Sequence, residues 1–453
     1  MPLSMLLTRR PLVGFAGLFL LLGFVGGAVL VPKGCSGVSE AAGERGAKQE
    51  ETDATGNENG DETEAQEPLG LFLTWRRDPT TTMSVDWHAP DATSRTLHYK
   101  PVGAEEWRTQ EATPHNFPYS ARVIYRTTLT GLEPGGSYRF RVGDFERRYK
   151  FRTLPAENHT EPLVFAAGGD TRHRQSLMER TNRVAMQYEP DFIVWGGDLA
   201  YADGRPDRVG RWYEFFDAIM NTLIDDDGRV VPIVVCIGNH EVRRGYLHRH
   251  DDYVQTDEFR ERIAPYFYAL FDFPGQPGYG VLDVADYLSL VILDSDHSNP
   301  VDGAQTEWLA EVLAEREDVP HVLPVYHVAA YPSHRSYGGR VQRRIREHWV
   351  PLLERHGIRV AFENHDHTYK RTHPIRDGEI SGDGIIYLGD GAWGVGTREG
   401  NSSDEWYINR FASKRHAIIV TLHGSHQHFL MVSEHGDVID EYPQTPHGLG
   451  RGE

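Results

Sequence analysis

Short runs in which every second residue is hydrophobic dominate the chain from about residue 69 to residue 154. Turn residues separate the runs, and none of them has the spacing of an amphipathic helix. This alternation predicts antiparallel strands with one buried face, and regular short strands are typical of an all-β sandwich, which we place at residues 69–155. The predicted strands lie in "TMSVDWHA", "RTLHYKPV", "RVIYRTTLTGL", "GSYRFRVGD" and "RRYKFRTLP".

After Pro155 the pattern changes to continuous apolar runs separated by amphipathic stretches such as "SLMERTNRVAMQY" and "GAQTEWLAEVLAERE". This alternation predicts α/β units whose strands are buried on both faces. Three late segments, "HAIIVTLHG", "QHFLMVSEHG" and "DVIDEYP", predict strands in hairpins at the edge of the sheet. We place this second domain at residues 160–443, followed by a tail at residues 444–453.

The first residues do not fit either domain. Arg9 and Arg10 precede an apolar run from Leu12 to Val31, which is long enough to cross a bilayer, so residues 1–34 are predicted to be a signal peptide or a membrane anchor. Cleavage, lipidation at Cys35 and retention as an anchor all remain open. Residues 35–68 are predicted to be a disordered acidic linker. The N-terminal segment therefore predicts an exported protein that is periplasmic, secreted or held at the cell surface.

Composition restricts the kind of protein and the kinds of binding partner. The chain has 453 residues, of which 39% are hydrophobic, so it can form a globular core. Its formal net charge of -19 argues against nucleic acid as a structural partner. The two cysteines, Cys35 and Cys236, lie in unrelated contexts and do not indicate a disulfide framework.

Five of the apolar runs after Pro155 end in side chains that can bind a metal. Because ligand sites in α/β sheets lie at the carboxyl ends of the strands, these side chains are expected to converge. The run ends are Asp170; Asp198 and Tyr201; Asn239 and His240; His327; and His365 and His367. Glycines at positions 169, 197 and 238 leave room for close backbone turns.

The chemistry of this set indicates two ions. Oxygen and nitrogen donors without a thiolate suit iron, manganese or zinc. Seven ligands are too many for one open catalytic ion and about right for two ions that share a carboxylate. Two such ions can together activate a water molecule for hydrolysis. The seven candidates are Asp170, Asp198, Tyr201, Asn239, His327, His365 and His367.

The order of these motifs resembles the metallophosphoesterase superfamily. "GGDLAY", "GNHE" and "HDHTYKRT" are the specific pieces, and Tyr201 together with the fibronectin type III-like stretch "LTGLEPGGSYRFRV" makes the chain similar to purple acid phosphatases. The resemblance covers residues 69–443. It implies a two-sheet α/β/β/α sandwich preceded by a small fibronectin III-like sandwich.

The resemblance also implies a role for each residue. Asp198 would bridge the two ions, and His240 would contact phosphate and act as a proton donor. Ferric iron would be held by Asp170, Asp198, Tyr201 and His367, and a divalent zinc, iron or manganese ion by Asp198, Asn239, His327 and His365. Asp198 and His240 are therefore the predicted catalytic residues.

The sequence departs from the family pattern at three positions without losing a ligand: Arg172 and Asn364 replace glycines, and Pro324 replaces a valine. The planar guanidinium of Arg172 can hold two phosphate oxygens, although a surface ion pair is the alternative. The paired histidines that some relatives carry after the fourth motif are absent. His334 lies in that neighbourhood and is predicted to contact substrate.

Three functions remain after these arguments. The first is hydrolysis of small phosphomonoesters by an exported acid phosphatase-like enzyme. The second is a phosphodiesterase or nucleotide-cleaving hydrolase with the same metal centre. The third, from a different class, is a surface binding protein whose fibronectin-like domain carries the function and whose metal site is vestigial.

Overall fold

The computed structural model describes residues 67–89, 95–158, 160–400 and 405–443. The predicted signal peptide or anchor, nearly all of the acidic linker, Cys35 and the tail lie outside the described residues. Within these described ranges, no helix has both the length and the apolar character needed to cross a membrane.

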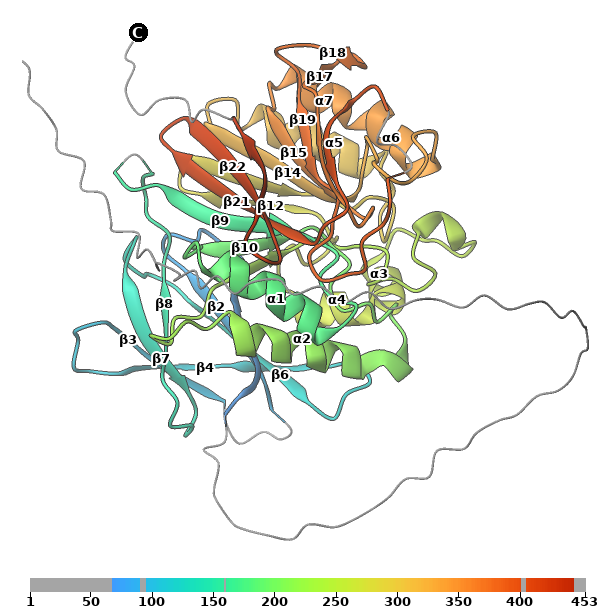
Figure 1. Ribbon diagram of the computed structural model, residues 1–453. Helices are drawn as coiled ribbons and strands as arrows, with labels where there is room; N and C mark the ends of the chain where they lie inside the picture. Colours follow the sequence, from blue (N-terminus) through green and yellow to red (C-terminus); the bar gives the residue numbers. More distant parts are fainter. Residues whose placement is uncertain (1–66, 90–94, 159, 401–404, 444–453) are drawn as a thin grey trace, which may run out of the picture. The chain divides into compact units, whose positions relative to one another are not determined.

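The N-terminal domain consists of two four-stranded antiparallel sheets, drawn in blue and cyan in Figure 1. In β7 the buried residues Tyr138, Phe140 and Val142 alternate with less buried ones, as predicted, whereas β2 is buried along its whole length. One sheet has the order β1 (Leu69–Thr74), β2 (Met83–Ala89), β6 (Val123–Leu129) and β5 (Thr113–Asn116). The other has the order β4 (Arg108–Glu111), β3 (Thr96–Pro101), β7 (Ser137–Val142) and β8 (Tyr149–Arg152).

The first sheet of the α/β domain has six strands. Its strands β9 (Leu163–Gly168), β10 (Phe192–Trp195) and β11 (Ile233–Val235) are parallel. The late hairpin strands extend the sheet from β9 to its edge, as predicted, and pair antiparallel. They are β21 (His416–His423), β22 (His426–Ser433) and β23 (Val438–Tyr442).

The second sheet has seven strands, and β13, β14, β15 and β19 form its parallel centre. In spatial order the strands are β12 (Gly280–Val284), β13 (Leu288–Ile292), β14 (His321–Val328), β15 (Val360–Asn364), β19 (Ile386–Gly389), β16 (Tyr369–Thr372) and β20 (Ile408–Ala412). A separate two-stranded ribbon pairs β17 (Ile375–Arg376) with β18 (Glu379–Ile380).

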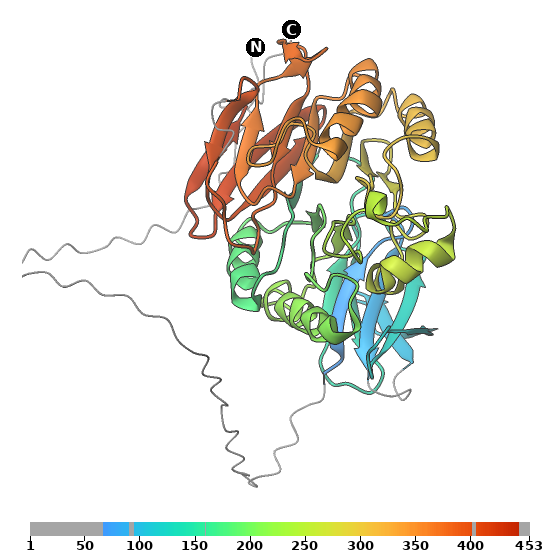
Figure 2. The same cartoon turned by 90° about the vertical axis from the view of Figure 1, so that its right-hand side faces the viewer.

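The inner faces of the two sheets share one apolar core, in which Phe165 and Val194 of the first sheet join Val325 and Phe362 of the second. Helices cover the outer faces. On the first sheet lie α1 (Gln175–Met186) and α2 (Val209–Thr222), seen side by side in Figure 1. On the second lie α5 (Ala304–Ala314), α6 (Arg340–His348) and α7 (Val350–Arg355), drawn in gold and orange in Figure 2. The α/β/β/α sandwich predicted from the sequence is confirmed.

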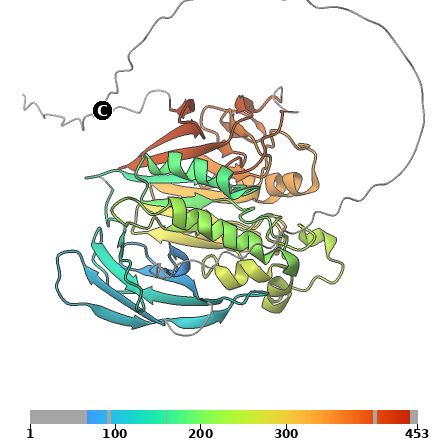
Figure 3. The same cartoon turned by 60° about the horizontal axis from the view of Figure 1, so that its bottom comes forward.

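The N-terminal domain packs directly on the α/β domain. Phe72 of β1 stacks on Phe216 of α2 with ring centroids 5.1 Å apart, and Arg126 of β6 donates to the carbonyl of Leu270 at 2.6 Å. Leu270 ends α4 (Pro265–Leu270), which follows α3 (Asp257–Ile263). Figure 3 shows the blue and cyan strands on the side of the molecule that also carries the green helix α2.

Candidate metal centre

The seven predicted ligands come from the carboxyl ends of five strands. Asp170 follows β9, Asp198 and Tyr201 follow β10, and Asn239 follows β11. His327 is the second-last residue of β14. His365 and His367 lie within three residues of the end of β15. The structure brings these residues together in two groups.

The first group consists of three buried side chains whose polar atoms face one another. The hydroxyl of Tyr201 lies 3.1 Å from Oδ1 of Asp170 and 3.2 Å from Nε2 of His367. Nε2 of His367 is 3.0 Å from the same Asp170 oxygen. The phenol, carboxylate and imidazole therefore form a compact triangle that can surround one cation.

The second group is centred on Nε2 of His327. This atom is 3.1 Å from Oδ2 of Asp198, 3.0 Å from Nδ1 of His365 and 3.2 Å from Oδ1 of Asn239. Donor atoms of Asp198, His327 and His365 all lie within 4.8 Å of one another, and all three side chains are buried. A candidate metal site is therefore present here. The other ring nitrogen of His327 faces the carbonyl of Gly196 at 2.9 Å, which fixes the ring orientation.

Left-handed backbone is concentrated among these residues. Five of the seven predicted ligands have a left-handed backbone, with φ of 55° at Asp170, 52° at Asp198, 58° at Tyr201, 83° at His365 and 60° at His367. Such a conformation costs a non-glycine residue about 1–3 kcal/mol and persists where the surrounding structure enforces it. The concentration of this conformation in five ligands at three strand ends indicates a site in which side-chain direction matters more than local stability.

Glycines make these close turns possible. A Cβ atom at Gly238 would lie 2.4 Å from Oδ1 of Asp198, and one at Gly391 would lie 1.8 Å from Oδ2 of Asp170. Glycines 169 and 196 leave the space that Asn364 fills, because a Cβ atom at either would meet its side-chain amide at 2.4 Å or less. Asn364, one of the departures from the family pattern, is thus accommodated, and it donates to the carbonyl of Tyr326 at 3.0 Å.

Glu241 is a supporting residue that the sequence argument did not single out, although it ends the "GNHE" motif. Its buried carboxylate accepts from the backbone amides of Asp198 at 2.9 Å, Leu199 at 2.8 Å and Gly238 at 2.8 Å. One side chain therefore joins the loops that follow β10 and β11. Burial, together with the nearby Asp198, raises the pKa of Glu241.

Charges in the centre depend strongly on one another. Burial alone lowers the pKa of His327, but the carboxylates of Asp198 and Asp170 outweigh it and raise the pKa to about 9. Burial and the neighbouring Arg335 lower the pKa of His365. Burial and Asp170 raise the pKa of Tyr201. The donor set is rich in oxygen and imidazole groups that a bound cation can hold in their deprotonated forms, so the residues present fit metal ions.

His240 lies at the open side of the centre, with 35% of its side chain exposed. Its Nδ1 is 2.5 Å from Oδ1 of Asp203, and its Nε2 is 3.9 Å from Oδ2 of Asp198. Its backbone amide donates to the other Asp198 oxygen at 2.7 Å, and its ring lies 4.2 Å from that of Tyr201. Asp203 was not predicted, although it stands two residues after Tyr201.

Arg172 and His334, which were predicted to contact substrate together with His240, both have protein partners in the structure. The buried guanidinium of Arg172 forms an ion pair with Glu214 of α2 and donates to the carbonyl of Ala200 at 3.3 Å. This ion pair, whose Glu214 partner is half exposed, is the alternative that the sequence left open for Arg172, and a contact of Arg172 with substrate stays a prediction. Nδ1 of His334 lies 2.8 Å from the carbonyl of Glu399, which turns the ring to a backbone partner.

Two other arginines lie closer to the ligands. Arg335 donates to Asp366, between His365 and His367, at 3.2 Å. The backbone amide of Arg398 donates to the carbonyl of His367 at 3.1 Å. Their approach depends on loops that meet only in the folded chain, which is why sequence spacing did not reveal them.

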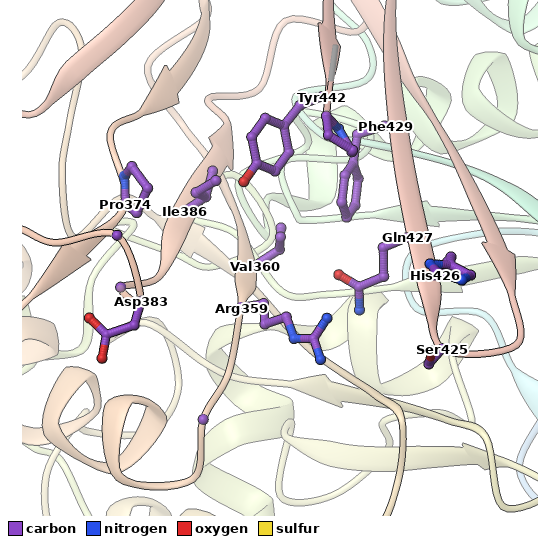
Figure 4. Close-up of a pocket in the computed structure, with 14 residues that line it drawn as sticks. Arg359, Val360, Pro374, Asp383, Ile386, Ser425, His426, Gln427, Phe429 and Tyr442 are labelled. Atoms are coloured by element: carbon purple, nitrogen blue, oxygen red, sulfur yellow. The ribbon is translucent and has the colours of Figure 1, made fainter. Parts of the chain in front are cut away.

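A different pocket, with a volume of about 390 Å³, lies at the amino end of β15 and is drawn in Figure 4. Arg359, Val360, Ile386 and Tyr442 line it, and none of the predicted ligands does. The metal centre is therefore at one end of the strand and this pocket at the other.

Comparison with known proteins assigns both domains. Residues 68–153 match the purple acid phosphatase N-terminal domain, and residues 159–369 match the calcineurin-like phosphoesterase family. Purple acid phosphatase 21 of Arabidopsis thaliana is 26% identical over 289 residues, 63% of this chain and 61% of that protein. Acid phosphatase type 7 of Mus musculus is 23% identical over 367 residues, 72% of this chain and 78% of that protein. The chain thus spans less than two thirds of some of these relatives.

A solved structure agrees with these matches. The purple acid phosphatase from yellow lupin (Lupinus luteus) seeds superposes with a TM-score of 0.70 at 17% identity, covering 83% of this chain and 74% of that one. This likeness shows the fold. The two domain matches, which lie in their expected order, show that the chain is similar to purple acid phosphatases of the calcineurin-like phosphoesterase superfamily.

Proposed function

We propose that the protein is an exported hydrolase of phosphomonoesters that works with two metal ions, as an acid phosphatase does. The observation that carries the proposal is the pair of buried donor groups at the carboxyl edge of the two sheets. Export is inferred only from the apolar run at residues 12–31. The domain matches support the reaction class.

The two groups would hold different ions. Asp170, Tyr201 and His367 would hold ferric iron, because a phenolate oxygen is a hard donor that favours the more highly charged ion. Asn239, His327 and His365 would hold a divalent zinc, iron or manganese ion, and Asp198 would serve both. Such ions supply an activated water and neutralise charge on the phosphate during in-line displacement.

His240 supplies the proton for the leaving group. Asp203 accepts from Nδ1 and so stabilises the imidazolium form, whose second proton, on Nε2, would pass to the leaving group and leave the neutral ring. General acid catalysis by a positioned histidine is worth roughly 10²- to 10⁴-fold in rate. Asp203 is thus a positioning residue, and it also pairs with Arg208.

Arg335 and Arg398 would help to orient the phosphate. Both are partly buried beside the turn that carries His365 and His367. A guanidinium in this position can donate two parallel hydrogen bonds to phosphate oxygens. The negative charge of the whole chain makes such local positive groups necessary for binding an anion.

The test is metal quantification on the purified full chain combined with parallel assays on a phosphomonoester and a phosphodiester. We expect two ions per chain and faster hydrolysis of the monoester. Preferred hydrolysis of the diester would assign the phosphodiesterase function to the same centre. A folded, metal-loaded protein that hydrolyses neither compound would support the binding-protein alternative.

Tyr201 tests the iron assignment separately. We expect the native protein to contain iron and to be coloured by a tyrosinate-to-iron charge-transfer band. Tyr201→Phe removes only the hydroxyl, so the variant should fold, lose the band and retain some activity. A colourless, active native protein with two divalent ions would refute iron while leaving the hydrolase proposal intact.

A further inference from the structure

A pocket with a volume of about 580 Å³ lies directly beside the metal centre, because Asn239 and His240 form part of its lining. Its remaining lining is unusually basic. Four arginines contribute to it, against two carboxylates, in a chain whose formal net charge is -19. The arginines are Arg205, Arg243, Arg244 and Arg249, and the carboxylates are Asp203 and Asp207.

The two carboxylates are already neutralised. Asp207 pairs with Arg205 at 2.8 Å, and Asp203 pairs with Arg208 and contacts His240. In the part of the chain that the structure describes, no ion pair joins Arg243, Arg244 or Arg249 to a carboxylate. We call these three residues, beside His240, the arginine pocket. Its positive charge is not compensated within the described protein.

The arginine pocket is held in shape by neutral contacts. Nη1 of Arg244 donates to the carbonyl of Arg249 at 3.1 Å, and Nη1 of Arg249 donates to the carbonyl of Arg244 at 3.0 Å. These two bonds close the loop between them. A guanidinium has five N–H donors, so each arginine keeps donors for a ligand.

Arg243 is fixed from both domains. Its Nε donates to the carbonyl of Gly204 at 2.9 Å, and its Nη2 donates to the hydroxyl of Tyr119 in the N-terminal domain at 2.8 Å. The N-terminal domain thus contacts an arginine that lines the pocket beside His240.

We propose that the arginine pocket binds a second phosphate group of the substrate while the first is hydrolysed at the metal centre. The protein then prefers compounds that carry two or more phosphates over compounds that carry one. This inference rests on the proposed function. The ligand class follows from the chemistry of the pocket, because uncompensated guanidinium groups match the geometry and charge of phosphate.

The experiment compares fructose 1,6-bisphosphate with fructose 6-phosphate and fructose 1-phosphate. We expect the wild-type protein to show a kcat/KM roughly tenfold higher for the bisphosphate, the effect of one or two charge-assisted hydrogen bonds. The double variant Arg244→Gln/Arg249→Gln should lose this preference while hydrolysing the monophosphates at the wild-type rate. Equal kcat/KM values in the wild type, or equal losses for all three substrates in the variant, would overturn the inference.

Three further variants control for charge and folding. Arg244→Lys/Arg249→Lys keeps the charge and should retain part of the preference. Arg355→Gln/Arg359→Gln removes the same charge at the opposite end of the sheet, where Figure 4 shows Arg359, and should leave the preference unchanged. The single variant Arg249→Gln loses only one of the two side-chain hydrogen bonds of this loop. It is used in the same experiment if the double variant does not fold.

Calorimetric binding separates this inference from the proposed function. If no ester is hydrolysed, the proposed function fails, and binding of the same three sugar phosphates still decides the role of the arginine pocket. Tighter binding of the bisphosphate that is lost in Arg244→Gln/Arg249→Gln supports it. Equal binding of the bisphosphate and the monophosphates contradicts it.

Discussion

Strand β14 begins and ends near a buried histidine, and the two histidines have opposite properties. At the amino end, His321 places Nε2 2.8 Å from the carbonyl of Gly424 and Nδ1 3.0 Å from the amide of Gln427. At the carboxyl end, His327 faces a carboxylate, an amide and a second imidazole. Burial lowers the pKa of His321, whereas Asp198 raises that of His327 against the same effect.

The backbone conformation around the two histidines differs as well. Among the described residues that line the pocket of Figure 4, at the amino end, no non-glycine residue has a left-handed backbone. At the carboxyl end, five predicted ligands do. One end thus has satisfied polar groups on relaxed backbone, and the other has facing donors on strained backbone. Buried histidines alone do not distinguish a structural site from a metal site, but their partners and backbone do.

The largest expected effect is that of Asp198→Asn. A shared carboxylate holds both ions, so its loss should lower metal content and reduce kcat/KM by about 10³-fold or more. Metal analysis and phosphomonoester assays measure both. The matched control is Asp383→Asn at the amino-end pocket, which should change neither quantity. Normal activity with two bound ions in Asp198→Asn would remove Asp198 from the centre.

Replacing each histidine of β14 by alanine should affect a different property: metal binding and activity for His327, and stability for His321. His327→Ala should lose the divalent ion and most activity, because three donors lose their common neighbour. His321→Ala should keep both and instead lower the free energy of unfolding by about 2 kcal/mol, because the Gly424 carbonyl loses its partner. Denaturant unfolding and metal analysis on both variants test this. Loss of metal in His321→Ala would show that the two ends are not independent.

The sequence predicted that the candidate ligands converge at one edge of a sheet, because apolar runs and their polar ends are local features. The carboxyl ends of parallel strands meet at one edge, so Asp170, Asp198 and His327 could be assigned to it before their distances were known. The alternation of apolar runs and amphipathic stretches likewise predicted α/β units, because it depends only on periodicity and chain order. The two-sheet sandwich was implied by the resemblance to metallophosphoesterases.

Other features depend on loops that are distant in sequence. Glu241 supports Asp198 across two strand ends, and Glu214 of α2 takes the guanidinium of Arg172. Neither partner can be identified from spacing, because each contact depends on where a separate element packs. Left-handed backbone at five ligands is also invisible to a sequence pattern, since propensity disfavours it in non-glycine residues.

The pH dependence of stability should differ between the two histidines once metal is removed with a chelator. Between about pH 6.5 and pH 9 the folded protein keeps a proton on His327 that the unfolded chain has released. Its free energy of unfolding should therefore fall as pH rises through this window, by roughly 3 kcal/mol. For His321 the pKa is lowered, so its contribution is lost below about pH 6.5 instead.

Chemical denaturation of the chelated protein at several pH values measures the slope. The variant His327→Ala should flatten the dependence between pH 6.5 and pH 9, and His321→Ala should leave it in place. A wild-type protein whose stability rises across this window would contradict the raised pKa of His327.

The smallest expected change in stability comes from replacing an amide side chain that contacts one of these histidines. Gln427 lies 3.0 Å from His321, and Asn239 lies 3.2 Å from His327, so distance alone does not separate them. Gln427→Ala should lower the free energy of unfolding by about 1 kcal/mol, the value of one neutral hydrogen bond, and should leave metal content and activity unchanged. Asn239→Ala should instead lose the divalent ion, because its amide oxygen faces the histidine nitrogen on the side shared with Asp198. Unfolding curves and metal analysis on both variants distinguish the two outcomes, and equal metal loss would show that both amides act on a single coupled network.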